Sequence, residues 1–260
     1  MHCAIMPSFM NSTWTHLKEE FSGWRAAEVA WFLFCEISMI SLSLWWKDDT
    51  AGIIAAAAGI AYTVFAGKGK TACCLFGMVN TPIYAFLAWK NAYYGDMALN
   101  IYYFAMMFPL FASWRRNPAA AGHGVKRTKL SGCDRIKWSA FCVLCILLTW
   151  LILEKLEGAR PLCDAITNVL SVAALALTVK RCVEQWALWI TVNLTETFMW
   201  FKVWKETGTS VSLLLMWILF LANGIYLWRI WLKDAKDQDH CHGRNGAIGN
   251  PHSMPSMAIE

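Results

Sequence analysis

Eight apolar runs divide this chain, and they constrain its fold more than any other feature of the sequence. Each run is about 16 to 22 residues long, the length at which an α-helix crosses the hydrocarbon core of a bilayer. Charged residues make up only 16% of the 260 residues and fall mainly between these runs. Soluble domains carry about 25% charged residues. The composition therefore excludes a soluble enzyme, a nucleic-acid-binding domain and a secreted disulfide scaffold.

The runs predict an all-α integral membrane protein with eight transmembrane helices in a single polytopic domain, residues 1–260. The connections between these helices are too short for an extramembrane domain. We expect a cytoplasmic or interfacial segment at 1–26, a basic cytoplasmic loop at 115–137 and a flexible cytoplasmic tail at 233–260. The expected helices cover 27–46, 51–67, 71–89, 97–114, 138–156, 161–179, 183–204 and 209–232.

The distribution of Lys and Arg gives the expected orientation. With the N-terminus in the cytoplasm, 17 of the 23 Lys and Arg residues lie in cytoplasmic segments. Seven of these are in the central loop 115–137. Because cytoplasmic loops carry an excess of these residues, we expect both termini in the cytoplasm.

A weak internal repeat predicts how the helices are grouped. A shift of 113 residues places Asn80 on Asn193 and overlays runs of similar length. Many secondary transporters are built from such repeats. We expect an extra N-terminal helix at 27–46, then two parallel three-helix bundles, 51–114 and 161–232, joined by a linker helix at 138–156.

The span 183–204 carries the most informative side chains. Trp186, Trp189, Asn193 and Glu196 recur at spacings of three and four residues, so they share one helical face. An amide and a carboxylate at membrane depth are costly unless they face a bundle interior or a watery cavity. Tryptophan rings attract cations, and an amide hydrogen-bonds hydroxyls or carboxamides. This face therefore suits a flat, cationic, hydroxylated ligand.

Structural roles for the same residues remain open. Trp186 and Trp200 lie near the span ends, where an interfacial belt needs only an amphipathic ring. Trp189 and Asn193 lie deeper, and their position favours a site over interhelical packing. Glu196 fits a site and a structural partner equally well.

Other polar residues in the spans extend the candidate site. Asn80 and Tyr84 lie at i and i+4, and Asn80 is the repeat counterpart of Asn193. Two further pairs at i and i+3 fit interhelical hydrogen bonding slightly better than a site. These pairs are Asn100 with Tyr103 and Asn223 with Tyr226.

Patterns for catalysis, metals and cofactors are missing from the sequence. It contains no HExxH, no GxSxG and no paired aspartates in the spans, so we predict no catalytic residue, metal or cofactor. Most of the ten cysteines lie in or beside apolar runs, where a free thiol behaves as a small hydrophobe. Glu36 is a lone carboxylate in 27–46, which fits a protonated group, a paired group or proton coupling.

Three segments of this chain resemble the bacterial nicotinamide riboside transporter (PnuC) family. A GKGK loop, an N-x-x-x-Y, a YGD, an EQWALW-x-x-x-N block and an N-x-x-Y occur together and in order. The resemblance covers roughly residues 25 to 235. The segments are AGKGKTACCLFGMVNTPIYAFLAWKNAYYGDMALNIYY at 66–103, VKRCVEQWALWITVNL at 179–194 and ANGIYLWRIWLK at 222–233.

The resemblance implies a 3 + 1 + 3 fold related to the sugar-transporting SWEET proteins, a homotrimer and a place in the bacterial inner membrane. It also implies facilitated diffusion of nicotinamide riboside, an NAD precursor, by alternating access. A cytosolic riboside kinase would trap the substrate by phosphorylation. The family's substrate-binding residues correspond to Gln185, Trp186, Trp189 and Asn193, and beyond these to Asn80, Tyr84, Asn100 and Tyr103.

Alternatives to this substrate and this function stay open. Members of the wider family are assigned to thiamine, riboflavin or deoxynucleosides, and thiamine is also a flat cation. A carrier of the same fold for one of these compounds is the nearest alternative. A membrane-embedded enzyme and a ligand sensor are less favoured.

Overall fold

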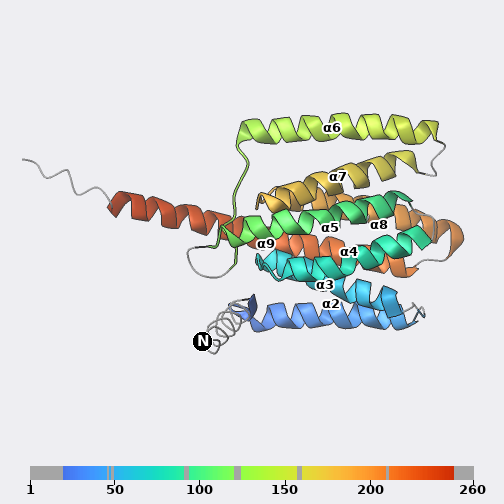
Figure 1. Cartoon of the computed structure of the whole chain (residues 1–260), viewed down its shortest axis with the longest axis horizontal. Coiled ribbons are helices and arrows are strands. Elements are labelled where there is room, and N and C mark those ends of the chain that lie inside the picture. The colour runs from blue at the N-terminus through green and yellow to red at the C-terminus, as the bar shows by residue number, and fades with distance from the viewer. Residues whose placement is uncertain are drawn as a thin grey trace, which may run out of the picture.

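The computed structural model describes residues 20–45, 47, 50–90, 94–119, 124–156, 160–208 and 211–248. Eight α-helices account for most of these residues, which agrees with the expected all-α fold (Figure 1). The helices are α2 (Ala26–Trp45), α3 (Thr50–Lys68), α4 (Cys73–Lys90), α5 (Tyr94–Arg115), α6 (Gly132–Lys155), α7 (Pro161–Val179), α8 (Gln185–Thr207) and α9 (Val211–Ile248).

Six of these helices are long and apolar enough to cross a membrane by length and composition. The other two, α4 and α8, carry the polar side chains on which the predicted site depends, including Asn80 and Asn193. Both helices lie between two of the apolar helices: α4 between α3 and α5, and α8 between α7 and α9. Their polar residues are therefore placed beside protein.

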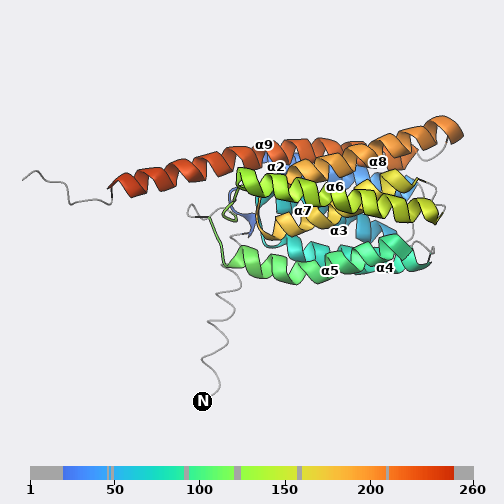
Figure 2. The same ribbon diagram turned by 90° about the horizontal axis from the view of Figure 1, so that it is seen from above.

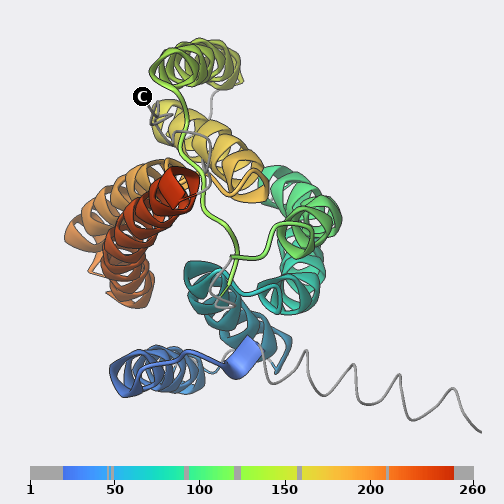
Figure 3. The same ribbon diagram turned by 90° about the vertical axis from the view of Figure 1, so that its left-hand side faces the viewer.

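Six of the helices form a closed ring. Around this ring the order is α3, α4, α5, α7, α8 and α9, and α9 contacts α3 again (Figure 3). Outside the ring, α2 packs on α3 and α9, and α6 packs on α7. The helices run side by side along the long axis, and α9 projects beyond the ring at one end, the tail end (Figure 2).

The largest hydrophobic core lies at the tail end and contains three indoles, the indole cluster of Trp114, Trp186 and Trp231. The ring centroids of Trp114 and Trp231 are 6.0 Å apart, and those of Trp186 and Trp231 are 5.9 Å apart. In the described part of the chain, α5 and α9 are not neighbours in the ring. The contact between Trp114 and Trp231 therefore crosses the ring interior and fills it at the tail end.

The C-terminal boundary of the last helix differs from the prediction. We expected a flexible tail from residue 233, but α9 continues to Ile248. No glycine or proline interrupts this segment before Gly243, so nothing in the sequence stops the helix at the membrane surface. Asp234 and Gln238, one turn apart, also bond to the loop before α6.

The start of α6 differs as well, because it begins at Gly132, six residues before the predicted 138. Ser131 is the N-cap: its Oγ accepts a hydrogen bond of 3.1 Å from the Asp134 backbone N–H. The same hydroxyl donates to the Asp134 carboxylate at 2.8 Å. This cap starts the helix inside the loop that was predicted at 115–137.

The predicted interfacial segment 1–26 lies mostly outside the described residues. Of its described part, Trp24 packs on Phe65 with ring centroids 5.1 Å apart. Glu28 in α2 pairs with Lys68 at 2.8 Å. These contacts attach the start of α2 to the tail end of α3.

Gly67 provides a test of how tightly α3 and α9 pack. A Cβ added to Gly67 would lie 2.2 to 2.8 Å from three side-chain carbons of Leu227. Overpacking typically costs about 1–3 kcal/mol. We expect Gly67→Ala to lower the thermal unfolding midpoint of the purified protein in detergent.

The same substitution in a Leu227→Ala background should cost much less, because the clashing side chain is gone. Gly95→Ala is the control, since a Cβ there meets nothing within 4 Å. An equal cost of Gly67→Ala in both backgrounds would contradict the packing.

Candidate functional site

The first turn of α8 places two buried hydrogen-bond donors beside the indole cluster. Gln185 is 2% exposed and Trp186 is 4% exposed. Oε1 of Gln185 accepts a hydrogen bond from the Thr178 hydroxyl. Within the described residues, Nε2 of Gln185 and Nε1 of Trp186 have no hydrogen-bond partner. Because buried donors are rarely left unpaired in folded proteins, these two mark a place suited to an acceptor group.

One turn further along α8, Trp189 meets a residue from the other half of the ring. Its ring and that of Tyr103 in α5 have centroids 6.4 Å apart and lie edge to face at 62°. The backbones of α5 and α8 are not neighbours among the described elements, because α7 lies between them in the ring. The contact between Trp189 and Tyr103 therefore lies inside the ring. The Tyr103 hydroxyl lies within hydrogen-bonding reach of Ser171 of α7. The ring thus brings together two site candidates from different spans.

The two amides related by the predicted repeat link neighbouring helices. Nδ2 of Asn80 donates to the Ala55 carbonyl of α3 at 2.7 Å. Nδ2 of Asn193 donates to the Phe220 carbonyl of α9 at 3.1 Å. Each amide nitrogen also lies against a glycine, because a Cβ on Gly59 or Gly224 would be 3.0 or 3.5 Å from it. Both amides therefore act as interhelical links, and a substrate contact for them stays a prediction.

Three carboxylates gather between the middle of the ring and the end opposite the tail. The carboxylate of Glu196 in α8 lies within hydrogen-bonding reach of the side chains of Thr167 and Trp200. It lies close enough to Asp164 of α7 and Asp96 of α5 to interact with both electrostatically. The three acidic side chains lie in one part of the ring, and in their ionised form they favour a cation there.

The remaining predicted residues are less central. Asn100 is buried, but its amide donates to the Asp96 carbonyl of its own helix at 2.8 Å. Tyr84 is 46% exposed. Oδ1 of Asn223 accepts a hydrogen bond from Nε1 of Trp31 at 3.1 Å, which links α9 to α2. The structure does not bring these three to the contact between Trp189 and Tyr103.

Sequence reasoning missed Trp114 and Trp231. Trp231 is fully buried, and its Nε1 donates to the Gly67 carbonyl at 2.7 Å. Trp114 donates in the same way to the Thr178 carbonyl at 2.8 Å. Both lie near span ends, where a tryptophan is usually interfacial, so spacing alone does not separate them from a belt.

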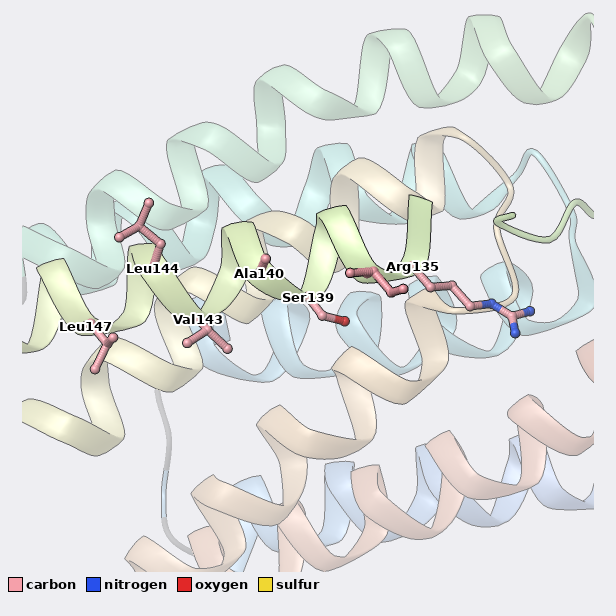
Figure 4. A pocket seen from close by; sticks show the side chains of 7 residues that line it. Arg135, Ser139, Ala140, Val143, Leu144 and Leu147 are labelled. Atoms are coloured by element: carbon pink, nitrogen blue, oxygen red, sulfur yellow. The ribbon is translucent and has the colours of Figure 1, made fainter. Parts of the chain in front are cut away.

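Two open hollows lie on the outside of the helices. The first, about 620 Å³, runs along the outer face of α6 and is lined by residues between Arg135 and Leu147 (Figure 4). The second, about 480 Å³, lies between α7 and α8 near Arg160 and Lys202. No predicted site residue lines either hollow. The candidate site is therefore defined by the contacts inside the ring.

Comparisons with known proteins all find similarity to transporters of nicotinamide compounds. A family model for the "Nicotinamide mononucleotide transporter" matches residues 49–233. The nicotinamide riboside transporter PnuC of Neisseria mucosa is 32% identical over 225 residues, which are 84% of this chain and 86% of that protein. The protein of the same name from Haemophilus influenzae is 28% identical over 226 residues, 85% and 96% of the two chains.

A solved structure is also similar to this chain. The crystal structure of the vitamin B3 transporter PnuC superposes with a TM-score of 0.74 at 33% sequence identity. The superposition covers 86% of this chain and 98% of that chain. The two proteins therefore share their helical fold over most of their length.

A measurement of unfolding free energy tests the hydrogen bond between Asn193 and α9. Interhelical hydrogen bonds in membranes contribute about 0.6 kcal/mol on average and up to about 1.7 kcal/mol. We expect Asn193→Ala to lower the free energy of unfolding in detergent by about this amount. Thr191→Ala is the matched control, because the Thr191 hydroxyl is exposed and bonds only Ala187 of its own helix. Equal stability of the two variants would show that the link contributes nothing.

Proposed function

The chain belongs to the nicotinamide mononucleotide transporter family, and from this membership we propose that it carries nicotinamide riboside across a membrane. The family consists of transporters, not enzymes. The observation that best supports the substrate is the face of α8 inside the ring. There the unpartnered donors of Gln185 and Trp186 lie one turn from the contact between Trp189 and Tyr103.

The chemistry of the riboside matches this face. Its pyridinium ring is a flat cation, which the rings of Trp189 and Tyr103 attract by about 0.5–2 kcal/mol each. Its carboxamide oxygen and ribose hydroxyls are acceptors for the donors of Gln185 and Trp186. In their ionised form, Glu196 and its two acidic neighbours would add a negative potential along the path.

The riboside fits better than the mononucleotide after which the family model is named. A mononucleotide adds a phosphate, an anion that Glu196, Asp164 and Asp96 would repel. Near the indole cluster, Arg127 is already paired with Asp234 at 2.7 Å. Thiamine shares the flat cation and remains the nearest alternative substrate.

Transport would occur by alternating access between two parallel repeats. We assign α3, α4 and α5 to one repeat and α7, α8 and α9 to the other, with α6 as linker, the SWEET-like 3 + 1 + 3 arrangement. In this assignment all eight described helices cross the membrane. The equivalent positions of α2 on α3 and α6 on α7 support it. Rocking of the two repeats around the central site would open it to each side in turn.

The proposed membrane orientation rests on the distribution of Lys and Arg, and the proposed oligomer and kinase rest on the family resemblance. The excess of Lys and Arg supports an inner-membrane protein with both termini in the cytoplasm, so that the tail end faces the cytoplasm. The family resemblance supports a homotrimer and a cytosolic riboside kinase that traps the substrate. Flux would then be downhill.

Calorimetric titration of the purified protein tests the ligand and the site together. We expect saturable binding of nicotinamide riboside, weakened about tenfold or more by Trp189→Ala, because a lost cation–π contact is worth up to about 2 kcal/mol. Trp204→Ala on the same helix is the control, since Trp204 is 40% exposed. Tighter binding of thiamine, riboflavin, thymidine or the mononucleotide would assign a different substrate.

Uptake into proteoliposomes tests the energetics. Without an ion gradient we expect riboside to equilibrate to equal concentrations inside and outside, and sodium or proton gradients should leave this end point unchanged. A riboside kinase with ATP enclosed in the vesicles should produce accumulation. Concentration against the riboside gradient without the kinase would show coupled transport instead.

A further inference from the structure

The segment from Gly124 to Ser131, the strap, crosses the tail end of the ring on its way from α5 to α6 (Figure 3). On the α5 side, the Lys126 N–H donates to the Asn117 carbonyl at 2.8 Å. On the other side, Thr128 pairs with the turn before α8: it donates to the Arg181 carbonyl and accepts from the Val183 N–H, both at 2.9 Å. The strap therefore joins the two proposed repeats at one end.

Two glycines seat the strap on the turn between α3 and α4. Gly69 and Gly124 have φ values of +71° and +86°, which favour glycine. A Cβ on Gly124 would lie 2.7 Å from the Lys68 carbonyl oxygen. Val125 follows and is 1% exposed, within the main core. A Cβ on Gly69, the second glycine of the GKGK loop, would lie 3.1 Å from the Val125 backbone nitrogen, so this glycine also allows the close approach of the strap.

Arg127 of the strap is a buried cation above the indole cluster. Its side chain is 4% exposed and pairs with Asp234 of α9 at 2.7 Å. The guanidinium carbon lies 4.9 Å from the ring centroid of Trp231. The Arg127 N–H donates to Oε1 of Gln238 at 2.9 Å. An ion pair, a cation–π contact and a hydrogen bond therefore attach the strap to α9.

Trp231 connects this cation to the proposed binding face. It lies under Arg127, contacts Trp186 of α8 and meets Trp114 across the ring interior. A molecule bound beside Trp186 and Trp189 reaches the tail end only if Trp114 and Trp231 separate. Because Arg127 covers Trp231, the strap must lift before that separation.

We propose that the strap and the ion pair of Arg127 with Asp234 form the gate that closes the tail end, and that substrate leaves there only after this pair breaks. The proposal rests on the transport function proposed above. Asp234 is 37% exposed, so water reaches the carboxylate side of the pair. When Arg127 swings into water, Asp234 is left at the exit as an attraction for a cationic substrate.

Cys182 is a built-in reporter of the gate. It is 4% exposed and lies under the strap, with the Thr128 hydroxyl 3.5 Å from its sulfur. Burial raises the pKa of its thiol, which keeps it protonated and unreactive. Lifting the strap would expose this thiol to a maleimide.

The experiment measures maleimide labelling of a full-length parent that keeps Cys182 as its only cysteine, purified in detergent. We expect Arg127→Ala and Asp234→Asn each to raise the initial labelling rate about tenfold or more, because the first removes the contacts of the buried guanidinium to α9 and the second leaves that buried cation without its partner. Recovery of slow labelling in the swap Arg127→Asp with Asp234→Arg would assign the effect to the pair. Arg116→Ala, which removes an exposed cation at the same end, is the control.

Labelling within twofold of the parent in both single variants would overturn the gate. Uptake of riboside separates this failure from failure of the proposed function. If the parent carries no riboside but Arg127→Ala exposes Cys182, the function is wrong and the gate stands. If the parent carries riboside and Arg127→Ala changes neither labelling nor uptake, the function stands and the gate is wrong.

Discussion

Lipid cannot satisfy polar groups, and this constraint explains the arrangement of the helices. The backbone is satisfied within each helix, but side chains such as Asn80, Asn193 and Glu196 need partners from protein. The structure supplies them by placing each polar helix between two apolar ones. The two trios then close into a ring, so the polar faces of α4 and α8 are enclosed by neighbours. The proposed site for a polar ligand uses the same arrangement that hides the polar residues from lipid.

The sequence predicted what depends on local pattern and missed what depends on distant contacts. Run length located all eight helices, and α7 occupies the expected 161–179, because bilayer thickness fixes how long an apolar run must be. Counting Lys and Arg placed Arg127 in a basic loop but gave no sign of its burial, which Asp234 and Trp231 create from far along the chain. The α8 stripe followed from helical periodicity. The carbonyls bonded by Asn80 and Asn193 did not, because periodicity says nothing about a partner helix.

The two junctions between the proposed repeats differ in how they are bonded. Along α5 and α7, Tyr102, Ser113 and Trp114 donate to backbone carbonyls at 3.1, 2.6 and 2.8 Å. At the α3 and α9 junction, the direct hydrogen bond among the described residues is that of Trp231 to Gly67. If the repeats rock as proposed, the α5 and α7 junction is the better hinge. The α3 and α9 junction, where Trp231 sits under Arg127, is then the one that opens.

The distribution of charged residues along the ring affects how a cation would move through it during the proposed rocking. In their ionised form, Asp96, Asp164 and Glu196 would attract it into the half of the ring opposite the tail, on the side of Trp189 and Tyr103. At the tail end it meets Arg127, whose charge Asp234 neutralises while the pair is intact. Within this pair the two charges cancel, so the closed pair blocks the substrate by packing. Once Arg127 leaves, the Asp234 carboxylate remains without its partner, so this group is available to attract a cation only in the open state.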